Sequence, residues 1–83
     1  MSDARRGYTH ALARIVAGLD QTSPVVQFAT YCIANDIPAE DIAKAFKVSK
    51  ATIYNWFKGV YHPRERQVAK MQEILARCKQ AEA

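Results

Sequence analysis

The sequence predicts an all-α protein, a compact bundle of about five helices. Apolar residues recur at the i, i+3, i+4, i+7 spacing of a helical face in successive segments of the chain. Hydroxyl residues, Pro and Gly stand between these segments, as is typical of helix starts and ends. The chain of 83 residues is long enough for one small domain that buries roughly 60% of its surface. We expect a flexible arm over residues 1–7, a single helical domain over 8–80 and a tail over 81–83.

Two helices are predicted in the first part of the domain, over residues 8–20 and 24–35. The packing face of the first consists of Tyr8, Leu12, Ile15, Val16 and Leu19. This helix either covers the core or provides an association surface, and the sequence leaves both open. A hydroxyl cap from Thr22 and Ser23, followed by Pro24 in the first turn, is expected to start the second helix. Its packing stripe consists of Val25, Phe28, Ala29, Cys32 and Ile33.

Residues 38–59 are predicted to form a helix, a three-residue turn and another helix. The apolar face of the first piece consists of Ala39, Ile42, Ala43 and Phe46. The turn ends at Ser49, whose hydroxyl can accept a hydrogen bond from the free amides of the next helix. One side of that helix carries Ile53, Trp56 and Phe57, and the other carries Lys50, Ala51, Tyr54, Asn55 and Lys58. Gly59 is placed to end it in the left-handed conformation.

A last helix is predicted after Pro63, with Glu65 in its first turn. Its apolar residues form a single seam made of Val68, Met71, Leu75 and Cys78. We favour packing of this seam on the core of the same domain. The alternative is that the seam pairs with the same seam of a second copy.

The charge is unevenly distributed along the chain. Residues 1–43 carry three Arg against five acids, whereas residues 44–70 carry seven Lys or Arg against Glu65 alone. A basic surface of this kind is expected to meet phosphate groups. The alternative is a solvated basic surface with no partner.

The two cysteines, Cys32 and Cys78, are far apart in sequence, and each lies in an apolar helical stripe. We expect buried free thiols, as in a cytoplasmic protein. His10 and His62 show no ligand spacing to either cysteine, so no metal site or other cofactor is expected.

The amino-terminal apolar run does not predict export. Arg5 and Arg6 precede it, as in a twin-arginine signal, but Arg14 interrupts the run and Asp20 closes it. No segment is long enough to cross a bilayer. We therefore expect a cytoplasmic protein without membrane contact.

Residues 38–59 resemble the helix-turn-helix of phage and bacterial repressors, the lambda-repressor-like or XRE-like type. Ala43 matches the small residue where the two helices cross, and Val48 and Ile53 match the residues that hold the second helix over the first. Further core positions match at Ile42, Phe46 and Trp56. At the first turn residue the family usually has glycine in the left-handed conformation, and here it is Lys47, at a cost of roughly 1 kcal/mol. The alternative is an ordinary pair of packed helices joined by a short turn.

The resemblance implies a double-stranded DNA-binding protein, a transcriptional regulator such as a repressor, that reads the major groove with helix 50–58. The implied base-reading residues are Ser49, Lys50, Ala51, Tyr54, Asn55 and Lys58. The expected phosphate contacts are Lys44, Thr52, Tyr61, Arg64 and, if the arm reaches DNA, Arg5 and Arg6. Such small domains act as homodimers on two-fold operators, and we expect no small-molecule ligand.

Two other function classes compete with a regulator. The first is an assembly protein, such as a phage DNA-packaging subunit like the small terminase, or a factor that binds another protein through the same helices. The second is an enzyme such as a recombinase. We expect no enzyme, because the chain lacks a carboxylate cluster for metal and a second domain to hold a nucleophile.

Overall fold

The computed structural model describes residues 10–82, and the apolar stripes of the sequence become five helices around one core. These helices are α1 (His10–Ala17), α2 (Pro24–Ala34), α3 (Ala39–Phe46), α4 (Lys50–Lys58) and α5 (Glu65–Glu82). No strand occurs over residues 10–82, so the predicted all-α fold is confirmed. The predicted arm over residues 1–7 lies outside the described residues, and α5 continues to Glu82 through part of the predicted tail.

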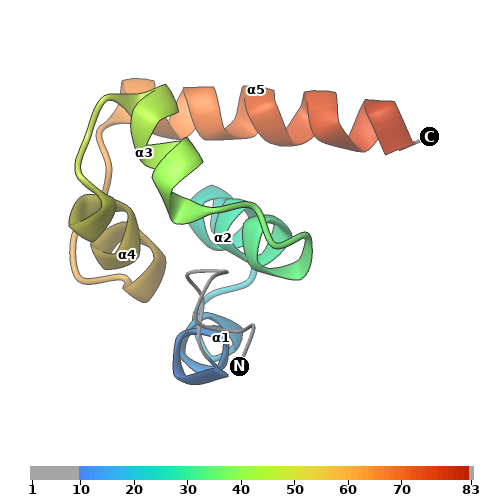
Figure 1. Cartoon of the computed structure of the whole chain (residues 1–83). Helices are drawn as coiled ribbons and strands as arrows, with labels where there is room; N and C mark the ends of the chain where they lie inside the picture. The colour runs from blue at the N-terminus through green and yellow to red at the C-terminus, as the bar shows by residue number, and fades with distance from the viewer. Residues whose placement is uncertain (1–9, 83) are drawn as a thin grey trace.

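Helix α2 lies at the centre of the bundle and packs against α1, α4 and α5 (Figure 1). Helix α5 runs along one side of the molecule and α1 lies on the opposite side. Helices α3 and α4 pack against each other, and α1 also contacts α4. Helix α4 thus has neighbours on both sides, α3 and α1.

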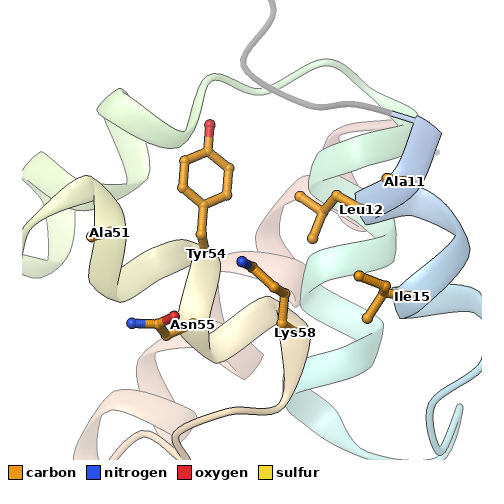
Figure 2. Close-up of a pocket in the computed structure, with 7 residues that line it drawn as sticks. All are labelled: Ala11, Leu12, Ile15, Ala51, Tyr54, Asn55 and Lys58. Atoms are coloured by element: carbon orange, nitrogen blue, oxygen red, sulfur yellow. The ribbon is translucent and has the colours of Figure 1, made fainter.

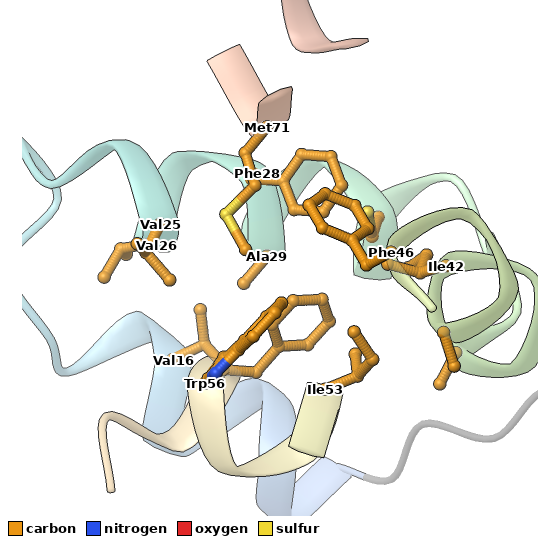
Figure 3. Close-up of a cluster of buried hydrophobic side chains, with 14 of the residues drawn as sticks. Val16, Val25, Val26, Phe28, Ala29, Ile42, Phe46, Ile53, Trp56 and Met71 are labelled. Atoms are coloured by element: carbon orange, nitrogen blue, oxygen red, sulfur yellow. The ribbon is translucent and has the colours of Figure 1, made fainter. Parts of the chain in front are cut away.

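Aromatic rings fill the centre of the core. The ring of Phe28 lies edge-on to Phe46 and to Phe57, with centroid separations of 6.0 and 6.3 Å. From α5, Met71 reaches this group and is fully buried (Figure 3). Each aromatic pair adds roughly 0.5–1.5 kcal/mol to the stabilisation from apolar burial. These contacts fix α2, α3, α4 and α5 relative to one another.

The seam of α5 packs on the domain's own core, as favoured above. Met71 and Leu75 are buried, and Val68 packs partly against the core. Cys78, one turn further on, is only half-buried, so the prediction of a buried thiol is wrong there. Cys32 on α2 is buried as predicted, and this burial, with a smaller contribution from Cys78, raises its pKa to about 12.

The first helix is shorter than predicted. Helix α1 ends at Ala17, and the Gly18 N–H donates to the carbonyls of Arg14 and Ile15. Leu12 and Val16 are buried, but Ile15, on the same predicted apolar face, is 43% exposed and points toward α4. Tyr8 lies outside the described residues.

The start of α2 also differs from the prediction. Ser23 is the N-cap residue and has extended backbone, but its side chain makes no capping hydrogen bond in the described structure. The Thr22 hydroxyl donates instead to the Asp20 carboxylate at 2.6 Å. That hydrogen bond and a second one from the Thr22 N–H lower the pKa of Asp20. Helix α2 thus begins with proline in its first turn and without a hydroxyl cap.

No helix among the described residues combines the length and the apolar character needed to span a membrane.

Candidate nucleic-acid interface

The turn between α3 and α4 is three residues long and begins in the left-handed conformation. Lys47 has φ 57° and ψ 44°, where glycine is usual. The Val48 N–H donates to the Ala43 carbonyl at 3.0 Å, which closes the end of α3 by a Schellman-type hydrogen bond. The backbone of this turn therefore takes the conformation that the resemblance implied, at a non-glycine residue.

The start of α4 is capped as predicted. The Ser49 Oγ accepts a hydrogen bond from the Thr52 N–H at 3.1 Å and lies 2.9 Å from the Thr52 hydroxyl. At the other end, Gly59 takes the left-handed conformation, with φ 80°. The predicted bounds of this helix are confirmed. Ser49 and Thr52, which were expected to contact DNA, are thus also hydrogen-bonded to each other.

Helix α4 has one buried side and one accessible side. Ile53, Trp56 and Phe57 are buried. Of the residues expected on the outer side, Lys50, Ala51 and Lys58 are exposed, whereas Tyr54 and Asn55 are half-buried. Tyr54, which the helical spacing placed on the outer side, also packs partly against the core.

A groove of about 480 Å³ separates α4 from α1 (Figure 2). Ala11, Leu12 and Ile15 line it from α1. From α4 it is lined by Ala51, Tyr54, Asn55 and Lys58. Lys58 lines the groove with its amine turned toward Tyr54 of the same helix, while Asn55 points away from α1. The sequence predicted the α4 residues of this surface but not those of α1, because no local pattern encodes a contact between distant helices.

Exposed cations lie on α3, on the α3–α4 turn, at the start of α4 and directly before α5. Lys44, Lys47 and Lys50 are exposed, as is Arg64 at the start of α5. Over residues 10–82 none of these four side chains takes part in an ion pair. Their charges are therefore available to an anionic partner.

Lys70 belongs to the same basic segment but contacts the protein itself. Its Nζ donates a hydrogen bond to the Ala45 carbonyl in the last turn of α3 and lies 5.0 Å from the centroid of the Phe46 ring. A cation at the end of a helix stabilises its dipole. Counting charges along the sequence could not distinguish this lysine, which stabilises the fold, from the accessible ones.

The connection between α4 and α5 exposes two large apolar side chains, Val60 at 60% and Tyr61 at 63%. Tyr61 was expected to contact phosphate, and its exposure leaves its hydroxyl accessible. The Arg64 N–H donates to the side-chain oxygen of Gln67 at 2.8 Å, which caps the start of α5. Arg5 and Arg6, the remaining expected phosphate contacts, lie outside the described residues.

The described part of the chain contains no group of three or more His, Cys, Asp or Glu side chains that could hold a metal ion. No protein-family model matches this chain, and no curated protein or solved structure matches it. The surface of α4 and its surroundings therefore provides the basis for inferring a function.

Proposed function

We propose that this protein is a sequence-specific double-stranded DNA-binding regulator whose α3 and α4 act as a helix-turn-helix. The observation that carries the proposal is the two-sided character of α4. Its apolar side is buried through Ile53, Trp56 and Phe57, while Lys50 and Lys58 project from an accessible side. A helix held in this way presents polar side chains on a rigid support.

The size and chemistry of α4 suit the major groove of DNA. An α-helix with side chains is about 10–12 Å across, and the groove is about 12 Å wide. In that groove Asn55 would bond the edge of adenine, Lys50 would donate to guanine, and Ala51 would contact a thymine methyl group. The amino-terminal residues of such a helix lie closest to the bases, and Lys50 and Ala51 occupy these positions.

The surrounding side chains would bind the phosphates. Lys44 and Arg64 are exposed cations on the elements that flank α4, and Tyr61 is an exposed hydroxyl donor. Contacts of this kind set the position of a protein on DNA without reading its sequence. The side chain of Thr52 is half-buried and bonded to Ser49, so Thr52 would contribute less to phosphate binding.

We further propose that the protein acts as a homodimer in the cytoplasm. One recognition helix reads only a few base pairs, and two half-sites about one helical turn apart (34–36 Å) increase both affinity and specificity. Met71 and Leu75 are already buried in their own domain, so pairing would use another surface than the α5 seam. The mass in solution tests this: a monomer or dimer fits a regulator, whereas a ring of many copies favours a DNA-packaging subunit.

Selection of bound sequences from random duplex DNA, repeated at two salt concentrations, tests the proposal. We expect a shared sequence motif among the bound duplexes. The Lys50→Ala/Asn55→Ala double variant should remain folded by circular dichroism but lose discrimination between the selected duplex and a shuffled one. Gln72→Ala/Arg77→Ala, which removes one amide and one cation from exposed positions of α5, is the matched control and should retain it. A steep salt dependence without any motif would reduce the interaction to phosphate attraction and contradict sequence-specific regulation.

A further inference from the structure

Helix α1 lies beside α4 on the side that the proposed DNA contact would use. Every α4 residue that lines the groove between the two helices belongs to the proposed base-reading set. The other wall of the groove is formed by Ala11, Leu12 and Ile15 of α1. A duplex that reaches the outer side of α4 would therefore also meet α1.

The dimensions decide which part of the DNA meets α1. Packed helices lie about 8–10 Å apart, and each is about 10–12 Å across. The pair is thus close to twice as wide as the major groove, which measures about 12 Å across and 8.5 Å deep. Only α4 fits inside it. Helix α1 would remain at the edge of the groove, where the sugar–phosphate backbone runs.

The side chains between the two helices suit such a strand. Ile15 is 43% exposed and offers an apolar surface to the carbon atoms of deoxyribose. Lys58 is exposed, lines the groove and offers a cation to the phosphates of that strand. None of the residues that line the groove in the described structure is acidic. Asn55 points away from α1, on the side where the base edges would lie.

We infer, on the basis of the proposed DNA-binding function, that α1 is a second part of the DNA interface and that Ile15 packs against the sugar–phosphate backbone beside α4. A contact with DNA would explain why this isoleucine is exposed, which packing in the core does not. Contacts to the backbone carry no sequence information directly. Changes at Ile15 should therefore alter affinity for every duplex by the same factor, unlike changes at Lys50 and Asn55.

Opposite charges placed at Ile15 test this inference. Ile15→Lys should tighten binding and steepen the dependence of log K on log salt by about 1, because it adds one phosphate contact. Ile15→Asp should weaken binding, equally for the selected duplex and for a random-sequence duplex pool. If Ile15 only stabilises α1, both substitutions should change the affinity for DNA in the same direction. Fluorescence anisotropy of labelled duplexes at several salt concentrations measures both quantities.

Gln72→Lys and Gln72→Asp provide the matched control. Gln72 is exposed on α5, which lies on the opposite side of the molecule from α1. These variants change the net charge by the same amounts but should alter affinity and the salt slope far less. If the Gln72 and Ile15 pairs behave alike, net charge alone explains the effect and the inference is overturned.

The outcomes separate this inference from the proposed function. If the Lys50→Ala/Asn55→Ala variant loses discrimination while both Ile15 variants bind like the wild type, α1 is not part of the interface but α4 still is. If both Ile15 variants bind more tightly than the wild type, α1 covers α4 rather than contacting DNA, and the inference is again wrong. If the wild-type protein binds none of the duplexes, the proposed function itself fails.

Discussion

The ring of Phe46, the last residue of α3, lies edge-on to the indole of Trp56 in α4, with centroids 5.7 Å apart and an angle of 78° between the planes. This contact connects the two helices on either side of the turn. Both side chains are buried. The position of the outer side of α4 relative to α3 therefore depends on this aromatic pair.

Loss of the Phe46 ring should destabilise the whole domain. Phe46→Ala leaves a cavity beside Phe28 and Trp56 and is expected to lower the free energy of unfolding by about 3–5 kcal/mol. Urea unfolding followed by circular dichroism measures the change. Tyr61→Ala, at a 63% exposed aromatic residue, is the control and should change stability by less than about 0.5 kcal/mol. Equal losses in the two variants would contradict the packing described for Phe46.

The left-handed conformation of Lys47 gives a prediction about glycine. In Lys47→Gly the relief of roughly 1 kcal/mol of backbone strain is offset only in part by the greater freedom of glycine in the unfolded chain, about 0.4–1 kcal/mol. We therefore expect a small gain in the free energy of unfolding. The same substitution inside α3, Lys44→Gly, should lower it by about 1 kcal/mol. Thermal unfolding measures the stability of both variants. Equal destabilisation of the two would contradict the left-handed conformation of Lys47.

The two serine N-caps should respond differently to alanine. Ser49→Ala removes the hydrogen bond to the Thr52 N–H and should cost about 1 kcal/mol of stability. The side chain of Ser23 makes no such bond at the start of α2, so Ser23→Ala should change stability by a few tenths of a kcal/mol at most. Denaturant midpoints of the two variants check the difference, and a larger loss at Ser23 would show that the capping assignment is reversed.

Local sequence signals predicted the parts of the fold that depend on local interactions. The bounds of α3 and α4 follow from the apolar spacing, the Ser49 hydroxyl and Gly59; α4 has its predicted bounds, and α3 begins at Ala39, one residue after the predicted start. The predicted hydroxyl cap of α2 is absent because another hydrogen-bond acceptor lies nearby. The Thr22 hydroxyl bonds to Asp20 instead of capping α2, because that carboxylate lies only two residues away.

The candidate site could be predicted only in part. Lys50, Ala51 and Lys58 are exposed, as the helical periodicity indicated. Tyr54 is half-buried and Ile15 is 43% exposed, and both line the groove where α1 meets α4. That contact joins segments about forty residues apart and depends on how the helices assemble around α2, which no spacing within either segment encodes.

Substitution of Lys70 should mainly lower stability, whereas substitution of Lys50 should mainly lower DNA affinity. Lys70→Ala removes the hydrogen bond to the Ala45 carbonyl and the cation over the Phe46 ring, and should lower stability by roughly 1 kcal/mol. Lys50→Ala should stay within about 0.5 kcal/mol of the wild type, because Lys50 is exposed and unpaired in the described structure. In duplex titrations the larger loss of affinity should come from Lys50→Ala. Equal losses of affinity would place Lys70 in the DNA contact too.

The buried thiol of Cys32 should make the protein less stable at alkaline pH. Desolvation, with a smaller contribution from Cys78, raises the pKa of Cys32 from 9.0 to about 12 in the folded protein. The folded state therefore keeps this proton above pH 9.0, where the unfolded chain releases it. The stabilisation is complete below about pH 9 and is lost as the pH rises toward 12, at up to about 1.4 kcal/mol per pH unit.

Cys32→Ala isolates this effect from the titration of lysines and tyrosines, which the variant shares with the wild type. Between pH 8 and pH 10.5, urea unfolding should show a smaller loss of stability for Cys32→Ala than for the wild type, by about 1–2 kcal/mol at the upper end. Cys78→Ala should follow the wild type closely, because burial is the main cause of the raised pKa and remains in that variant. Identical pH dependence in the wild type and Cys32→Ala would mean that the Cys32 thiol titrates in the folded protein as it does in the unfolded chain, and would contradict its place in the core between α2 and α5.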